Sequence, residues 1–187
     1  MKRFRIAASP LWGFALAAVI VSHCLAQASP AQESAKPKLR VENADAVGPR
    51  PLEKETSDKV ARFYLDAWKS LHTAFAENRP EALDNSFTGI AREKLATAIR
   101  DQQALGIKTS YHDQSHDLKF AFYSSEGLSV QVLDTVDYDL QVIDHGQVVG
   151  LRHIRSCYVA VLTPTEVRWK VRVFQADSET RPEPSVE

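Results

Sequence analysis

Residues 128–162 read LSVQVLDTVDYDLQVIDHGQVVGLRHIRSCYVAVL. Apolar and polar residues alternate along residues 128–143 and again along residues 148–162, which is the period of a half-buried β-strand. His145-Gly146 stands between the two runs, and a two-residue loop ending in glycine is typical of a tight β-hairpin. The sequence therefore predicts two long antiparallel strands joined by a short turn.

Two shorter alternating segments, residues 116–123 and 167–175, flank this hairpin. Only short turns separate the four segments, whereas parallel neighbours need connections of about a dozen residues or more. Gly127 suits the left-handed position of a three-residue loop. We therefore expect a four-stranded antiparallel meander.

Three helices are expected before this sheet. Apolar residues recur every three or four positions from an N-cap at Ser57 to Phe75. Pro80 suits the first position of a short helix over residues 81–85, and a third helix covers residues 88–105. Helices followed by strands predict an α+β fold, with three N-terminal helices packed on one face of a curved sheet.

The N-terminus has the layout of a secretory signal peptide, with basic residues, an apolar run and small residues at a cleavage site. The apolar run, residues 11–21, precedes Ala26-Gln27-Ala28. It is shorter than the roughly 20 residues that a membrane-spanning helix needs. Cleavage after Ala28 is expected to leave no stable membrane span, which predicts a bacterial protein that is periplasmic or secreted.

The chain divides into four predicted regions. Residues 1–28 are the signal peptide. Residues 29–56 and residues 177–187 contain few large apolar side chains and are expected to be a disordered linker and a disordered tail. Residues 57–176 have the length of one small domain.

Composition excludes several function classes. The net charge of -1 gives no reason to expect a nucleic-acid partner. With 7 glycines and 2 cysteines, the chain has neither a disulfide scaffold nor a glycine-rich nucleotide loop, and no cofactor is expected. His112 and His116 lie four residues apart, which on an extended strand separates them by roughly 13 Å, so no metal site is expected either.

The two-residue loop also predicts which side chains share a face. Val132 would face Val159 and Leu140 would face Leu151, so that apolar rows form an inner face. The same register places a group of polar residues near the middle of that face. These residues are His116, Asp134, Tyr138, His153 and Arg155.

Asp134 interrupts an otherwise apolar row, and Arg155 is expected diagonally across from it. A buried carboxylate without a partner is costly, so Asp134 needs a partner, a proton or contact with water. Polar residues on the concave side of a helix-covered sheet predict the floor of a pocket. A partly exposed structural ion pair between Asp134 and Arg155 is the simpler alternative.

A tryptophan-bearing first helix, two further helices and a meander ending in Val167-Arg168-Trp169-Lys170-Val171 resemble the nuclear-transport-factor-2-like superfamily, including its snoaL-like and ketosteroid-isomerase-like members. The resemblance covers residues 57–176. It implies an α+β cone with a cavity between the first helix and the concave sheet, often in a homodimer through the outer sheet face. Members include isomerases, dehydratases, cyclases and non-catalytic binding domains, and the enzymes typically hold a carboxylate and a Tyr or His in the cavity.

Three functions stay open. The preferred one is an exported, non-catalytic domain that binds a small molecule or a protein partner in the cone, with Arg155 orienting a polar or anionic group. The second is a cofactor-free lyase or isomerase, with Asp134 as general base and Tyr138 or His153 as acid. The third is a structural dimerisation module. The candidate ligand-binding residues are Asp134, Arg155, His116, His153, Tyr138, Tyr64, Trp68 and Trp169.

Overall fold

The structure of the chain is a computed structural model that describes residues 36–42 and 48–177. Its N-terminal elements are strand β1 (Lys38–Glu42), helix α1 (Lys54–Glu77), the 3₁₀ helix η1 (Pro80–Leu83) and helix α2 (Gly89–Ala104). Four strands follow: β2 (Ile107–Tyr123), β3 (Val130–Asp144), β4 (Gln147–Pro164) and β5 (Trp169–Ala176). Among the described residues there are thus two α-helices and one 3₁₀ turn, where three helices were predicted.

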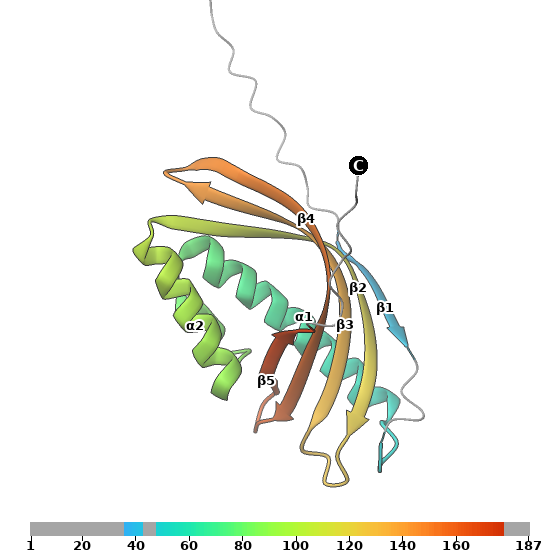
Figure 1. Cartoon of the computed structure of the whole chain (residues 1–187). Helices are drawn as coiled ribbons and strands as arrows, with labels where there is room; N and C mark the ends of the chain where they lie inside the picture. Colours follow the sequence, from blue (N-terminus) through green and yellow to red (C-terminus); the bar gives the residue numbers. More distant parts are fainter. Residues whose placement is uncertain (1–35, 43–47, 178–187) are drawn as a thin grey trace, which may run out of the picture. The chain divides into compact units, whose positions relative to one another are not determined.

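The strands form one sheet in the order β1-β2-β3-β4-β5. Strands β2 to β5 pair antiparallel, which confirms the predicted meander, and β1 adds a fifth strand parallel to β2. The sheet curves around α1 and α2, which both lie on its concave side (Figure 1). The α+β architecture is confirmed, and the counts of helices and strands differ from the prediction.

Strand β1 corrects the prediction of a disordered linker over residues 29–56. Leu39 pairs with His116 and Val41 pairs with Leu118. Helix α1 also begins inside this region, at Lys54 rather than after Ser57. Composition alone misses such a strand because its backbone hydrogen bonds are made with a segment more than 60 residues away in the sequence. The signal peptide predicted at residues 1–28 lies outside the described residues.

The β3–β4 hairpin has the predicted loop but not the predicted register. His145 and Gly146 form the two-residue turn, with φ angles of 47° and 81°. Val149 is then an extra residue in β4, because Val142 faces Gly150 while Ile143 faces Val148. A one-residue bulge turns every later side chain of the strand to the opposite face.

The bulge places two candidate residues on the outer face of the sheet. His153 faces Asp139 and its Nδ1 lies 3.0 Å from the Asp139 carboxylate. Arg155 faces Asp137, with its Nη1 3.7 Å from that carboxylate, and its side chain is 71% exposed. The predicted neighbourhood of Asp134 and Arg155 on the inner face is therefore wrong.

Aromatic rings fill the space between α1 and the middle of the sheet. Trp68 is the centre of this group, with ring centroids 5.2 Å from Tyr158 and 5.4 Å from Phe174. Its centroid is also 6.1 Å from that of Tyr138. Because of the bulge, Tyr158 points inward, where its two neighbours along β4 would have pointed in a strand without the bulge. The middle of the cone is therefore a packed core, where the sequence predicted an open pocket.

Gly127, in the β2–β3 loop, provides a test of the turn geometry. Its φ is +71°, and a Cβ atom there would lie 2.9 Å from Tyr123 Oη and 3.2 Å from Arg50 Nη1. Gly106, after α2, has a φ of +73° and meets no described atom within 4 Å. We expect Gly127→Ala to lower the free energy of unfolding by about 2 kcal/mol and Gly106→Ala by about 1 kcal/mol, because only the first adds a clash to the backbone strain. Urea denaturation of both variants checks this, and equal losses would contradict it.

Candidate functional site

Five polar side chains form a continuous chain from the core to the edge of α1; we call them the buried polar chain. Tyr64 Oη donates a hydrogen bond to Asp134 Oδ2 at 3.0 Å. The same oxygen lies 2.7 Å from His116 Nδ1, and His116 Nε2 lies 3.3 Å from Asp113 Oδ2. The other Asp113 oxygen lies 3.2 Å from His72 Nε2. This buried polar chain connects α1, β2 and β3 through side-chain contacts alone.

A second bulge, in β2, makes the central link of this chain. The pairing of β2 with β3 skips Gln114, between Asp113 and Ser115. In a regular strand, residues three apart point to opposite faces. The bulge puts Asp113 and His116 on the same face, where they contact each other. Among the described residues, no group of three or more His, Cys, Asp or Glu side chains is arranged to hold a metal ion.

The two carboxylates keep His116 charged. Burial by itself lowers the pKa of His116, but hydrogen bonds and charges from Asp113 and Asp134 outweigh it and raise the pKa to about 9. Burial also raises the pKa of Asp113, yet the hydrogen bonds and charges of His116 and His72 lower it to about 2. At neutral pH His116 is therefore an imidazolium and Asp113 is a carboxylate.

Tyr64 remains a protonated donor at the inner end of the chain. Burial raises the pKa of its hydroxyl well above the ordinary value, and the nearby charge of Asp134 raises it further. Its side chain is fully buried, as is that of Asp134. The inner half of the buried polar chain is thus closed to solvent.

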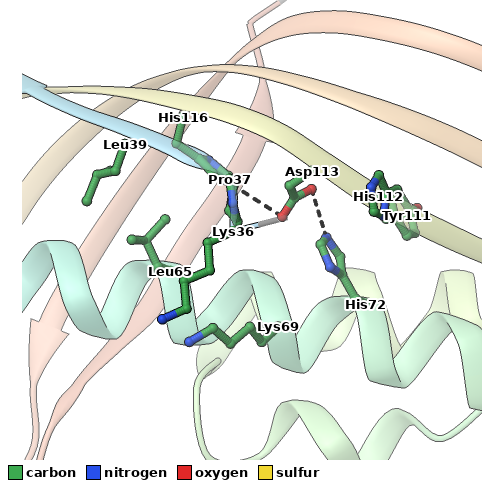
Figure 2. A pocket seen from close by; sticks show the side chains of 10 residues that line it. All are labelled: Lys36, Pro37, Leu39, Leu65, Lys69, His72, Tyr111, His112, Asp113 and His116. Atoms are coloured by element: carbon green, nitrogen blue, oxygen red, sulfur yellow. Dashed lines mark hydrogen bonds and ion pairs between the residues drawn. The ribbon is translucent and has the colours of Figure 1, made fainter. Parts of the chain in front are cut away.

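A cavity of about 380 Å³ opens at the outer end of the buried polar chain (Figure 2). It lies between α1, β2 and the strand β1 with the two residues before it. The side chains that line it are Lys36, Pro37, Leu39, Leu65, Lys69, His72, Tyr111, His112, Asp113 and His116. Its size is in the range of cavities that hold small molecules.

Asp113 is the polar group best placed to meet a ligand there. Its side chain is 10% exposed, and its buried Oδ1 lies 3.2 Å from His72 Nε2. Figure 2 shows both groups on the wall of the cavity, with the ammonium groups of Lys36 and Lys69 pointing away from Asp113. A ligand could therefore meet an acceptor at one end and cations at the other.

Five of the eight candidate residues are gathered around one point of the cone. Tyr64, Asp134 and His116 are joined by hydrogen bonds, and Trp68 packs against His116 with ring centroids 5.3 Å apart. Tyr138 belongs to the same aromatic group. Of these five, His116 lines the cavity.

The other three candidates lie elsewhere. His153 and Arg155 are on the outer face, and Trp169 faces Pro164 near the end of β4, half-buried against the core. The pair of Asp134 with His153 as base and acid is therefore excluded by the geometry. Tyr138 also makes no hydrogen bond to Asp134; its hydroxyl lies 3.0 Å from that of Tyr158.

Sequence reasoning identified His116 but missed the other residues that form the cavity wall. The acidic and imidazole side chains of Asp113 and His116 were visible in the sequence, but their contact depends on a bulge that no local pattern indicated. Leu39 was missed because it falls in the region predicted as linker. His72 and Tyr111, whose rings stack at 5.4 Å, carry no distinctive motif.

No family model and no curated protein matches the sequence. Among solved structures, the intermembrane-space region of the chloroplast protein ARC6 is similar at a TM-score of 0.57 and 14% identity, over 68% of this chain and 98% of that one. A scytalone dehydratase homologue from Novosphingobium aromaticivorans matches at a TM-score of 0.47 and 13% identity, over 67% of this chain and 89% of that one. ActVI-ORFA from Streptomyces coelicolor matches at a TM-score of 0.45 and 11% identity, over 63% of this chain and 95% of that one.

These similarities concern the fold. The chain has the nuclear-transport-factor-2-like fold, as its element order indicated. At this level of identity the comparison transfers no reaction and no ligand, because one fold carries many unrelated functions. Within the described part of the chain, no helix has the length and apolar character to cross a membrane.

The charged state of His116 predicts how stability depends on pH. Because its pKa rises from 6.5 to about 9, its stabilising effect is complete below pH 6.5 and is lost between there and pH 9. The lowered pKa of Asp113 gives a stabilising effect of its charged form, which is complete above pH 3.8 and is lost as the pH falls toward 2. We expect the free energy of unfolding to fall by roughly 3 kcal/mol on the alkaline side, measured by urea denaturation.

Two matched variants identify the group that causes the loss of stability at alkaline pH. His116→Gln should be less stable and should lose the alkaline decline, because glutamine does not titrate. His153→Gln, on the exposed outer face, should keep the decline. Parallel pH curves for the native protein and His116→Gln would show that another group is responsible.

Proposed function

We propose that this chain is a non-catalytic domain that binds a small molecule in the cavity between α1, β1 and β2. The observation that carries the proposal is the cavity of about 380 Å³ with the Asp113 carboxylate on its wall, a side chain that is 10% exposed. A carboxylate on a cavity wall gains free energy when a ligand donates a hydrogen bond to it. A hydroxyl, amide or amine on the ligand would do so.

The rest of the lining narrows the chemistry of the ligand. Leu39, Leu65 and Tyr111 provide apolar walls for its body. Lys36 and Lys69 line the same cavity and favour a neutral or anionic group at the end away from Asp113. The proposed ligand is therefore a small, mostly apolar molecule with a hydrogen-bond donor at one end.

The electrostatics of the site favour binding over catalysis. A general base or acid works best when its pKa lies near the operating pH. Asp113, with a pKa of about 2, is a weak base. His116, with a pKa of about 9, has both ring nitrogens in contact with carboxylates. Asp134, the base of the enzymatic alternative, is fully buried behind His116. The described side chains thus suit a rigid binding site better than an acid–base catalytic site.

A cavity-filling variant tests the proposal. Leu65 lines the cavity, so Leu65→Trp should fill it and abolish binding, whereas Leu128→Trp, at a side chain 59% exposed in the β2–β3 loop, should leave binding intact. The probes are hydroxyl- and amine-bearing aromatic fragments. At ten times its dissociation constant a bound fragment should stabilise the native protein by about 1.4 kcal/mol, seen as a raised Tm.

Asp113→Asn provides a second arm of that experiment. It keeps the shape of the cavity wall and removes the charge, so the Tm increase should become clearly smaller. Asp139→Asn removes a carboxylate of the outer face and should leave the increase unchanged. Fragments that stabilise Leu65→Trp as strongly as the native protein would contradict the proposed site.

We also propose that the domain acts outside the cytoplasm, on the basis of residues 1–28 alone. Expression of the full chain in a bacterium with a general secretion system should give a mature protein in the periplasm. Mass spectrometry should find its N-terminus at Ser29, and Ala28→Arg should block the processing. An unprocessed cytoplasmic protein that retains Met1 would contradict export.

A further inference from the structure

The cavity of the proposed site continues beyond Leu39 and Leu65. A hollow of about 260 Å³ adjoins it, since Leu39, Leu65 and Lys69 line both spaces. Figure 2 shows Leu39 extending from β1 toward α1 and Leu65 extending from α1 toward β1. The two spaces together form one groove between the helix and the strand, which we call the α1–β1 groove. The remaining lining of the hollow is Val41 of β1 and Asp58, Ala61, Arg62 and Asp66 of α1.

The α1–β1 groove is elongated. On α1 its lining runs from Asp58 to His72, which is about 21 Å along a helix that rises roughly 1.5 Å per residue. On β1 its lining runs from Pro37 to Val41, which is about 13 Å along an extended strand. A compact molecule fills only one end of a space of this shape, whereas a linear chain follows its length.

An aliphatic surface lies along the groove. Leu39 and Val41 pair with buried residues of β2 and point to the concave side of the sheet. Leu39 is nevertheless 50% exposed and Val41 44% exposed, because the groove separates them from α1. Each methylene of a ligand that covers such side chains leaves water and gains free energy. The groove therefore favours an aliphatic ligand.

The helix side of the groove also carries charged side chains, and their charges cancel. Lys54 donates a hydrogen bond to Asp58 at 2.7 Å, and Lys69 donates one to Asp66 at 2.8 Å. The guanidinium of Arg62 lies over the neighbouring phenyl ring of α1, 5.5 Å from its centroid. The two acidic and two basic side chains of this lining are Asp58, Asp66, Arg62 and Lys69. They add no net charge that would select a charged tail.

The charged residues of β1 point away from the groove. They alternate with Leu39 and Val41, so their side chains lie on the opposite face of the strand. These residues are Lys38, Arg40 and Glu42. Arg40 and Glu42 lie 3.8 Å apart in an ion pair on that face. They therefore take no part in selecting a ligand of the groove.

The head of the ligand is selected at the other end of the groove, where the cavity wall carries both signs of charge. Asp113 accepts hydrogen bonds there and repels an anionic group. Three basic side chains that line the same cavity repel a cationic group. These are Lys36, Lys69 and His116. A hydroxyl, the smallest uncharged donor, can donate to Asp113 without either repulsion.

We infer that the α1–β1 groove binds a linear aliphatic chain with a terminal hydroxyl. The hydroxyl donates a hydrogen bond to Asp113, and the tail passes between Leu39 and Leu65 to Val41. This inference rests on the proposed function, because it assigns the class of ligand that the same site binds. It adds that the ligand extends beyond the cavity into the hollow.

Chain length tests whether the tail reaches the hollow. An extended chain advances by about 1.2 Å per bond, so 1-octanol fits within the cavity and 1-dodecanol extends into the hollow. Equilibrium dialysis of the full-length chain against the two radiolabelled alcohols measures both dissociation constants. The constant for 1-dodecanol should be at least about tenfold lower, because its additional methylenes leave water.

The outcomes separate this inference from the small-molecule site. Equal dissociation constants for the two alcohols would overturn the inference and leave the cavity as a binding site. Binding of the aromatic fragments but of neither alcohol would also overturn this inference alone. Failure of the alcohols and the fragments together would contradict both.

Matched variants locate the tail. Val41→Asp places a charge against the end of the chain and should weaken 1-dodecanol binding at least about fivefold. The same variant should change 1-octanol binding less than about twofold, which also shows that the cavity is intact. Val167→Asp, at a side chain 81% exposed in the β4–β5 turn, should change neither. Unaltered binding of 1-dodecanol to Val41→Asp would contradict a tail in the hollow.

The hydroxyl is tested with 1-methoxydodecane, which keeps the chain and lacks the donor. This ether should bind the native protein at least about fivefold more weakly than 1-dodecanol, because Asp113 receives no hydrogen bond from it. That preference should shrink at least about threefold in Asp113→Asn and persist in Asp139→Asn, on the outer face. An ether that binds as tightly as the alcohol, or an unchanged preference in Asp113→Asn, would contradict the hydroxyl head.

Two ionic amphiphiles test the charge of the head. Dodecanoate and dodecylammonium keep the aliphatic chain and replace the hydroxyl by an anion and a cation. Each should bind at least about fivefold more weakly than 1-dodecanol, because the cavity wall repels both signs of charge. Equal or tighter binding of either ion would overturn the uncharged head.

Discussion

The described part of the molecule depends on one interaction, the charged His116 held between Asp113 and Asp134. Burying these ions costs several kcal/mol each, and their mutual attraction returns that free energy only while all three are present. Tyr64 satisfies one oxygen of Asp134 from α1. The group therefore connects α1 to the sheet through Tyr64 as well as contributing to stability while His116 is charged. A helix displaced by one turn would remove the Tyr64 donor from Asp134 and leave it only the contact with His116.

The same group explains why the cavity lies where it does. The aromatic rings around Trp68 fill the cone on the inner side of His116. On the outer side, Asp113 and His72 face the space between α1 and β1. The open volume of the fold is thereby shifted from the middle of the cone to its edge, where β1 and its neighbouring residues form a wall. The nuclear-transport-factor-2-like fold thus supplies the scaffold, and this local arrangement supplies the site.

Two single-residue bulges decide which side chains meet. The extra residue at Val149 carries His153 and Arg155 to the outer face. The extra residue at Gln114 does the reverse for Asp113, which it places beside His116. In both strands the composition would allow either arrangement, because polar residues occur on both faces. Strand register that follows from alternation therefore holds only as far as the first bulge.

The sequence by itself determined the antiparallel meander, the two-residue turn at His145, and the α+β class, because alternation and turn residues are local signals. It also identified Asp134 as a buried carboxylate in need of a partner, since a charge in an apolar row always requires one. Only the tertiary structure decided that its partners are His116 and Tyr64. It also decided that β1 completes the sheet and that the cavity opens on Asp113. These depend on bulges and on pairing between distant segments, whose free energy arises only when the chain is folded.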